Sequence, residues 1–440
     1  MSNSLEQYID VFNSSRTLLE AKSPDVLNRR RPGALGVLEA AGRLPEKGDE
    51  GYPEVAVNEM FAPDYGLNIG RVDFGSTAVA PGCDQAVSGR PTVTVVNDTP
   101  YVNPVNLPEG VEVMSLSEAA EKYPSSFDEE IAPADNPLVA LNDLLVQDGV
   151  FIRVKRNVAV GKPVQILSLF NSAHPMMAVR RIFIEVEEGA AASVLLCEHP
   201  LAEHVENLSS RVVEVRVGSH ASLDVYDIEE ASAKSRRASV FASKQMEGSR
   251  LNVCSLFLNG GTTRNEFYPS YAGEHCATRL GGLVIGNGRQ TVDNSVRLVH
   301  NMPRCSSEQL FKYALFEEAR CSFEGMVKVN EGAVHTDARQ SNRNLLASPD
   351  ARMYAMPQLE IYCDDVKASH GSATGQLDER ALFYMRQRGI PEQEARMMLV
   401  NAFMTDVLDT IGDEVLRERL RHLVDLRLRG AEKVCAGCKP

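Results

Sequence analysis

The sequence predicts a mainly β protein, with a stacked β-helix (a solenoid) at its centre and helical regions at both ends. Three observations predict this fold. Short runs of β-branched and apolar residues follow one another through the middle of the chain, as at 151–154 and 212–217. A turn of small residues recurs at Gly189, Gly218 and Gly248, in steps of roughly 30 residues, which is typical of solenoids. Apolar residues return to helical spacing near both termini.

The regular glycine spacing separates two β architectures. A unit of two or three short strands cannot bury its inner face alone, so stacking successive units is the economical way to form a core. A β-sandwich would show similar strands without the glycine period, and it remains the alternative fold.

The N-terminal part is expected to be mostly helical, with loops. Ser4 can cap a first helix that carries Leu5 and Tyr8 on one face. Residues 46–90 are rich in glycine, proline and aspartate, which predicts loops and short pieces. The expected division is an N-terminal region, a β-helix core, a C-terminal helical domain and a tail, at residues 1–147, 148–375, 376–434 and 435–440.

Two capping aspartates mark the C-terminal helical domain. Asp378 precedes a run with apolar residues at helical spacing, and Gly389 ends it. Asp413 precedes a last helix that should end near Gly430. These signals predict a compact pair or trio of helices.

Composition and charge disfavour several classes of protein. The 440-residue chain has a net charge of −14, and phosphate binding needs clustered lysine and arginine, so nucleic acid is not an expected partner. No apolar run approaches the length needed to cross a bilayer, and the N-terminus lacks the features of a secretory signal. We therefore expect a cytoplasmic protein without a membrane partner.

The nine cysteines are expected to be reduced thiols rather than disulfides, because the cytosol is reducing. Cys435 and Cys438 have the spacing of a metal-binding pair, but structural zinc normally needs four ligands. Whether this pair binds metal or simply belongs to the tail is left open by the sequence.

Motifs of the common enzyme classes are missing. The run 281–288 is glycine-rich but lacks the lysine of a phosphate-binding loop, so it is expected to form tight solenoid turns. Asp364 and Asp365 are adjacent and would point to opposite faces of a strand, unlike the paired carboxylates that cleave polysaccharides. We predict no enzyme activity, with a β-helix metalloenzyme and a purely structural solenoid module as alternatives.

Soft-metal ligands gather in one part of the chain. They are His300, Cys305, Cys321, His335, Cys363 and His370. Thiolate and imidazole suit iron, zinc and iron–sulfur clusters, although buried core thiols would explain the same cysteines. His370 falls in a polar stretch between a strand-like run and the helix after Asp378, which predicts a loop at a fold boundary.

Six motifs in this part of the chain carry a family resemblance. They are Thr-Asp-Ala-Arg-Gln-Ser-Asn at 336–342, Pro-Gln-Leu-Glu-Ile at 357–361, Asp-Asp-Val-Lys at 364–367, His-Gly at 370–371, Leu-Phe-Tyr at 382–384 and Arg-Gly-Ile at 388–390. Together they resemble the SufB/SufD family, the scaffold subunits of the SUF iron–sulfur cluster assembly machinery. The short chain, and Ala368 where SufB subunits carry a functional cysteine, favour the SufD side of this family.

The resemblance implies a right-handed parallel β-helix, in agreement with the glycine period. It also implies a scaffold that pairs side by side with a SufB-like subunit through the β-helices and binds a SufC-like ATPase through the C-terminal helical domain. Iron or an iron–sulfur cluster would be held transiently at the subunit interface, with no cofactor bound tightly by the isolated chain. When isolated, the chain would be able to form a homodimer.

The resemblance also points to site residues. By its place in Ala-Ser-His-Gly, His370 matches the histidine implicated in cluster assembly, and Cys363 is a second candidate. Whether His370 ligates iron or relays a proton is open, since imidazole does both. The candidates for ATPase contact are Phe383, Tyr384, Arg386 and Arg388, because aromatic and arginine side chains supply most interface energy. The alternative is that the two aromatic residues pack between the helices and the solenoid.

Overall fold

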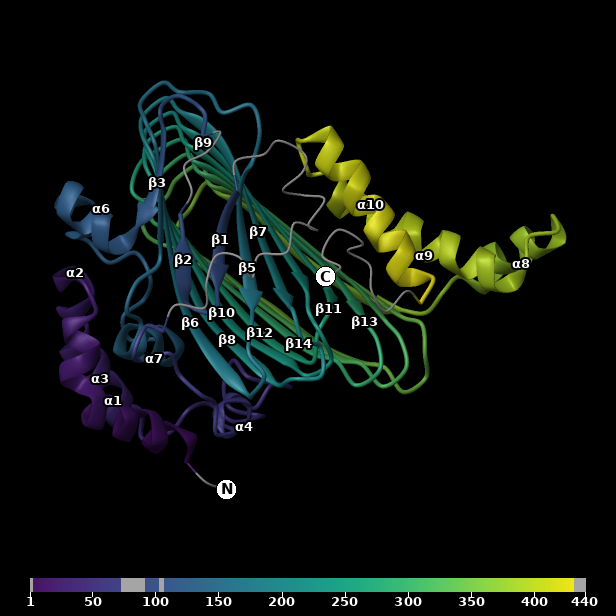
Figure 1. Ribbon diagram of the computed structural model, residues 1–440. Helices are drawn as coiled ribbons and strands as arrows, with labels where there is room; N and C mark the ends of the chain where they lie inside the picture. The colour runs from purple at the N-terminus through teal and green to yellow at the C-terminus, as the bar shows by residue number, and fades with distance from the viewer. Residues whose placement is uncertain (1–2, 73–91, 103–106, 431–440) are drawn as a thin grey trace.

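Two long β-sheets form a solenoid with helices on its outside in the computed structural model of the chain (Figure 1). The structure describes residues 3–72, 92–102 and 107–430. One sheet has ten strands in the order β19-β17-β15-β13-β11-β9-β7-β5-β1-β2, and the other has nine in the order β18-β16-β14-β12-β10-β8-β6-β4-β3. From β4 onward, consecutive strands alternate between the sheets and pair in parallel with the strand two places along. The predicted parallel solenoid is confirmed.

The strands are longer than the runs that predicted them, with nine to eleven residues each from β6 onward. The ten-stranded sheet holds β1 (Thr92–Val96), β2 (Thr99–Tyr101), β5 (Val164–Phe170), β7 (Ala191–Pro200), β9 (Ser222–Glu230), β11 (Arg250–Asn259), β13 (Ala277–Gly286), β15 (Ser306–Leu315), β17 (Asp337–Leu346) and β19 (Lys367–Gly375). The nine-stranded sheet holds β3 (Val111–Ser115), β4 (Val150–Val154), β6 (Met176–Val186), β8 (Asn207–Val217), β10 (Ser235–Gln245), β12 (Thr262–Tyr271), β14 (Thr291–His300), β16 (Arg320–Val329) and β18 (Arg352–Ile361).

Each turn of the solenoid adds one strand to each sheet. Ala277 of β13 pairs with Ser306 of β15, which pairs with Asp337 of β17 and then with Lys367 of β19. The step is roughly 30 residues, as the glycine spacing predicted. Side chains at equivalent positions therefore stack in columns along the solenoid.

Glycines serve both turns and close packing. Gly189 and Gly248 have positive φ angles of 68° and 67° at the same corner position two turns apart, and His220, with a φ angle of 57°, holds that position in the turn between them. The prediction that the run 281–288 forms turns is wrong in part, because Gly282 lies inside β13. A Cβ atom on Gly282 would lie 2.2 Å from the Phe311 ring, so this glycine makes room for a core aromatic.

The interior of the solenoid is apolar on one side and ionic on the other. Val213 and Val225 belong to the apolar core between the sheets. Farther along the same two strands, Arg211 binds the carboxylate of Asp227, with Nη1 and Oδ1 3.1 Å apart, and Arg237 binds the same carboxylate. These ionic side chains are buried, so half of each such strand lacks the apolar pattern by which strands are recognised.

Helices from the N-terminal part cover the nine-stranded sheet. They are α1 (Ser4–Ala21), α2 (Asp25–Asn28), α3 (Arg31–Ala41), α4 (Val57–Phe61), α6 (Leu116–Lys122), the 3-10 helix η2 (Pro124–Phe127) and α7 (Pro137–Leu145). Their apolar faces pack with Phe183 and its neighbours on the sheet. The predicted Ser4 cap is wrong: Asn3 caps α1, and the Ser4 hydroxyl donates to Asn58 Oδ1 at 2.7 Å. Strands β1 and β3, from the same part of the sequence, pair with β5 and β4.

The C-terminal helices are α8 (Glu379–Gln387), α9 (Glu392–Leu408) and α10 (Glu414–Leu428). As predicted, Asp378 and Asp413 cap α8 and α10, accepting backbone N–H groups at 2.8 Å. Helices α9 and α10 pack on the ten-stranded sheet through residues such as Met404 and Leu420. Helix α8 projects away from the solenoid (Figure 1). None of the helices in the described ranges combines the length and apolar character needed to span a membrane.

Candidate functional site

The last turn of the solenoid is open. Strands β18 and β19 stand at the ends of their sheets, and no strand in the described part of the chain lies beyond them. In β17, buried and exposed residues alternate, whereas in β19 every residue is exposed except the half-buried Ala368. A strand at a sheet edge leaves a row of backbone N–H and C=O groups available to another chain.

His370 lies inside strand β19 and not in the predicted loop. It pairs in register with Gln340 of β17, whose Nε2 donates to Gln309 of β15 at 2.9 Å inside the solenoid. Two residues along, the Ser372 hydroxyl donates to the buried Asn342 at 3.0 Å. The side chains on this face of β19 therefore continue the columns of buried polar residues inside the solenoid. His370 is therefore an exposed imidazole at the mouth of the solenoid interior.

Apolar side chains accompany His370 at this open end. Met353 and Leu359 of β18, with Val366 and Ala368, pack on the end of the apolar core while remaining only partly buried. Pro357 also lies in β18, and its missing N–H suits an edge strand. The end of the solenoid is thus a partly covered apolar surface framed by two unpaired strand edges.

Cys363, the second predicted site residue, lies in the turn after β18. It is half-buried against the same core, and its Sγ lies 3.3 Å from the carbonyl oxygen of Asp364. The other candidate soft-metal ligands do not form a site with Cys363. His300 and Cys321 are buried, which lowers the pKa of the imidazole to about 4 and raises that of the thiol. Exposed His335 pairs with Asp365 instead.

A metal centre with three or more ligands is not assembled by the described residues of this chain. Within 3–72, 92–102 and 107–430, no three His, Cys, Asp or Glu side chains converge in a way that would hold a metal ion. The predicted pair Cys435 and Cys438, and Cys83, lie outside the described residues.

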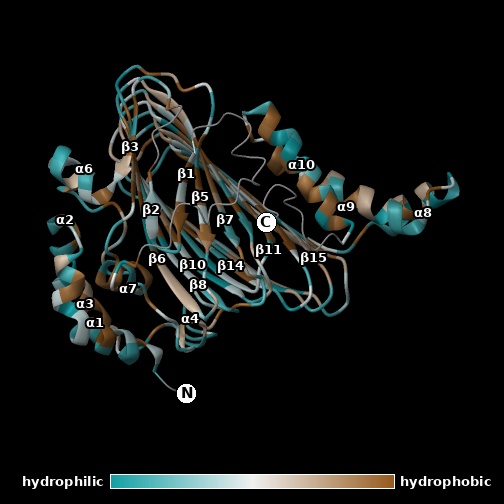
Figure 2. Cartoon of the chain, in the orientation of Figure 1, coloured by the Kyte–Doolittle hydropathy of each residue, from teal (hydrophilic) through white to brown (hydrophobic). Residues whose placement is uncertain are grey.

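Helix α8 carries three of the four predicted ATPase contacts, and its C-cap residue Arg388 is the fourth. Phe383 and Tyr384 are 62% and 57% exposed, so they do not pack between the helices and the solenoid. The Arg388 guanidinium stacks over the Tyr384 ring at 4.7 Å, and Arg386 pairs with Glu392 at 3.3 Å. The surface of α8 is otherwise largely hydrophilic (Figure 2). Two exposed aromatic rings on a projecting polar helix are typical of a contact surface.

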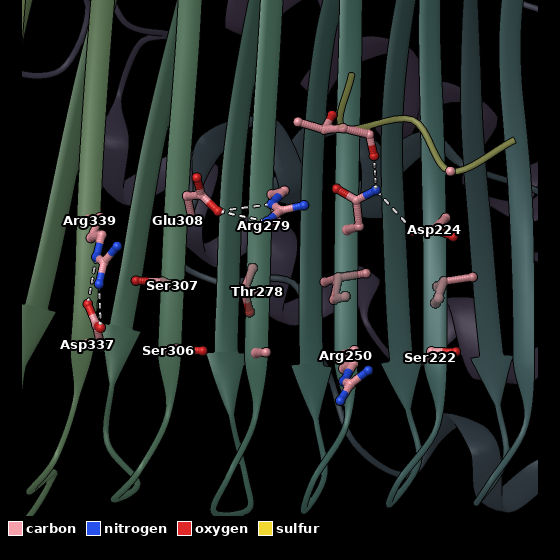
Figure 3. Close-up of a pocket in the computed structure, with 16 residues that line it drawn as sticks. Ser222, Asp224, Arg250, Thr278, Arg279, Ser306, Ser307, Glu308, Asp337 and Arg339 are labelled. Carbon is pink, nitrogen blue, oxygen red and sulfur yellow. Dashed lines mark hydrogen bonds and ion pairs between the residues drawn. The ribbon is translucent and has the colours of Figure 1, made fainter. Parts of the chain in front are cut away.

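A groove of about 530 Å³ lies on the outer face of the ten-stranded sheet beside the turn between α9 and α10 (Figure 3). Its Glu308 and Asp337 carboxylates are held by Arg279 and Arg339, each pair at 2.9 Å. Burial raises the pKa of Asp224 at the other end of the groove. The groove therefore presents internally satisfied ion pairs rather than the close carboxylate pair of a glycosidase.

These features define a β-solenoid with an open end and a projecting helical arm, which is the shape of an assembly component. The SufBD core domain of the SUF system of FeS cluster assembly matches residues 169–403, and the SufBD protein N-terminal region matches residues 2–166. The chain belongs to this SufBD family.

Curated relatives agree with the family assignment. The chain is 28% identical over 336 residues to the iron–sulfur cluster assembly protein SufD of Escherichia coli, covering 74% of this chain and 75% of the relative. It is 26% identical over 426 residues to an iron–sulfur cluster assembly SufBD family protein of Synechocystis, covering 94% and 93%. A SufD of Bacillus subtilis is 24% identical over 315 residues, covering 71% of each chain.

Proposed function

We propose that this chain is a SufD-type scaffold subunit of a SUF complex, and not an enzyme. The observation that carries the proposal is the open last turn of the solenoid, with His370 at its mouth. We assign this end to a SufB-like subunit and the exposed aromatic residues of α8 to a SufC-like ATPase. Iron or an iron–sulfur cluster would be transient cargo between the subunits, in the cytoplasm.

The backbone of β19 supports pairing at the open end. Lys367 donates its N–H to Thr336 at 2.8 Å, so its backbone faces β17. Because successive residues of a strand point their N–H groups to opposite sides, the N–H groups of residues 368, 370, 372 and 374 face the open edge. An edge of this length is an aggregation hazard unless another strand covers it. A SufB-like solenoid end would add strands to both sheets, so we propose pairing end to end instead of the side-by-side pairing that the resemblance implied.

Two neighbouring proline substitutions test this pairing. Ser372→Pro removes an N–H group that faces the open edge, so it should weaken copurification with the SufB-like subunit and leave most of the fold intact. Gly371→Pro is the matched control, because it removes an N–H group that faces β17 and should lower the thermal stability of the chain itself. Full pairing by a folded Ser372→Pro protein would contradict the proposed interface.

Point substitutions are the right test of α8. Deleting the helical region would uncover the apolar sheet face under α9 and α10 and harm the fold. The double substitution Phe383→Ala and Tyr384→Ala should reduce ATPase binding at least tenfold without a change in melting temperature, because both rings are exposed. Val415→Ala, at a 74% exposed apolar residue of α10, is the control and should bind normally.

The metalloenzyme and the purely structural module are the other candidate functions. Anaerobic purification with and without the two partners, followed by iron and sulfide analysis, separates the three. The scaffold role predicts iron and sulfide on the complex only. Stoichiometric iron on the isolated chain with turnover of a substrate would favour an enzyme, and an assembled complex that never acquires iron would favour a structural module.

A further inference from the structure

Two buried cysteines stack on neighbouring turns, away from the open end. Cys276 and Cys305 are the residues immediately before β13 and β15, whose first residues pair in register. Each cysteine is 1% exposed. Ser249 and Thr336 occupy the same position on the turns before and after them, so the column places two thiols side by side between two hydroxyls.

The two sulfur atoms converge on one backbone oxygen. The carbonyl oxygen of Gly273 lies 3.2 Å from Cys276 Sγ and 3.4 Å from Cys305 Sγ. The carbonyl oxygen of Met246 lies 3.0 Å from Cys276 Sγ as well. A single S–H group can donate to only one of these oxygens at a time, whereas a cation between the sulfurs would be attracted to both.

The spacing of the column favours a metal over a disulfide. Neighbouring strands lie about 4.8 Å apart, and equivalent side chains in a register-matched column are separated by about the same distance. Two metal–thiolate bonds of about 2.3 Å in line span almost that length. A disulfide needs Cβ atoms about 3.8 Å apart, so it would require the turns to move closer.

The two thiols also contact each other. The hydrogen bond from the Cys305 thiol, ahead of contacts with Ser249, lowers the pKa of Cys276 to about 7 and raises that of Cys305. Burial is the largest cause that raises the pKa of Cys321, which stays a neutral thiol.

We propose that Cys276 and Cys305 form a two-coordinate site for a soft monovalent cation, with copper(I) as the probe. Thiolate ligands select copper(I) over harder ions. Binding forms two metal–sulfur bonds, releases the thiol protons to solvent and involves no electron transfer. The site is independent of the proposed scaffold role, since neither cysteine belongs to the open end or to α8.

An anaerobic titration of the full chain with copper(I) against a chromophoric chelator tests the site. The background carries Cys83→Ser, Cys363→Ser, Cys435→Ser and Cys438→Ser, so that these four thiols do not compete. We expect about one copper(I) per chain, with two sulfur neighbours and no nitrogen or oxygen neighbour by X-ray absorption.

Single substitutions complete the test. Cys276→Ala and Cys305→Ala should each weaken copper(I) binding at least a hundredfold, while Cys321→Ala should leave it unchanged. Absence of tight binding in the background protein would overturn the proposal, as would binding by either alanine variant as tight as that of the background protein. If an alanine variant fails to fold, the X-ray absorption spectrum of the copper-loaded background protein still tests the proposal. Nitrogen or oxygen ligands in that spectrum would contradict a dithiolate site.

Discussion

Glu229 offers a quantitative test of the ionic interior. Its carboxylate is 1% exposed and accepts a hydrogen bond from the Thr263 hydroxyl at 2.6 Å. The nearest cation, Arg237, lies 3.5 Å away and already binds Asp227. Burial is the largest cause that raises the pKa of Glu229, from its ordinary value of 4.5 to about 7.

The sign of the effect follows from proton linkage. The native state binds the Glu229 proton more tightly than the unfolded state, so the free energy of unfolding falls as the pH rises from about 4.5 to about 7. At about 1.4 kcal/mol per pKa unit, the free energy of unfolding is about 3 kcal/mol lower above pH 7 than it is below pH 4.5. Glu229→Gln removes the charge at every pH, so it should raise the free energy of unfolding at pH 8 by up to about that amount and change it little at pH 5.

Urea unfolding followed by circular dichroism at pH 5 and pH 8 measures this difference. Glu308→Gln, at an exposed carboxylate, is the control and should show no such pH dependence. Suppose instead that Glu229→Gln destabilises the protein at pH 8. Glu229 would then be a charged partner of Arg237, and the argument from burial would be wrong.

Three further substitutions test other parts of the account. His370→Ala should change the free energy of unfolding by less than about 0.5 kcal/mol, because the side chain is exposed, yet lower the cluster yield of the assembled complex, measured as iron and sulfide per complex. Cys363→Ser should lower the melting temperature more than the cluster yield, because Cys363 packs on the core; the reverse order would make it a ligand. Gly282→Ala should destabilise the chain by about 1–3 kcal/mol in urea unfolding, because its Cβ would meet the Phe311 ring; wild-type stability would show that the ring moves freely.

The sequence predicted the helix caps and the solenoid turns because each depends on interactions between residues close together in the chain. The aspartates before α8 and α10 were recognised because a side-chain cap needs only its own helix. The glycine spacing predicted the length of a solenoid turn because Gly189 and Gly248 share one positive-φ corner position two turns apart, while Gly218 lies two residues before that position in the turn between them. Exposed residues such as His220 adopt the same conformation in other turns, so glycine marks only some of them.

The candidate site could not be read in the same way. Strand β19 has no alternation of apolar and polar residues, because it is exposed on almost every side and exists through its pairing with β17. His370 therefore appeared to fall in a loop, and only the register with Gln340 places it at the mouth of the interior. Strand β10 escaped recognition for a related reason, since its Arg237 is buried in an ion pair contributed by β9.

Hydrogen exchange of residues 367–375 tests the central claim most directly. On mixing the chain with a SufB-like subunit, we predict strong slowing of amide exchange in β19, because the N–H groups that face the open edge would gain strand partners. Peptides from α1, on the far side of the molecule, serve as the internal reference. Unchanged exchange in β19 within a stable complex would contradict the claim that the open end of the solenoid is the pairing surface.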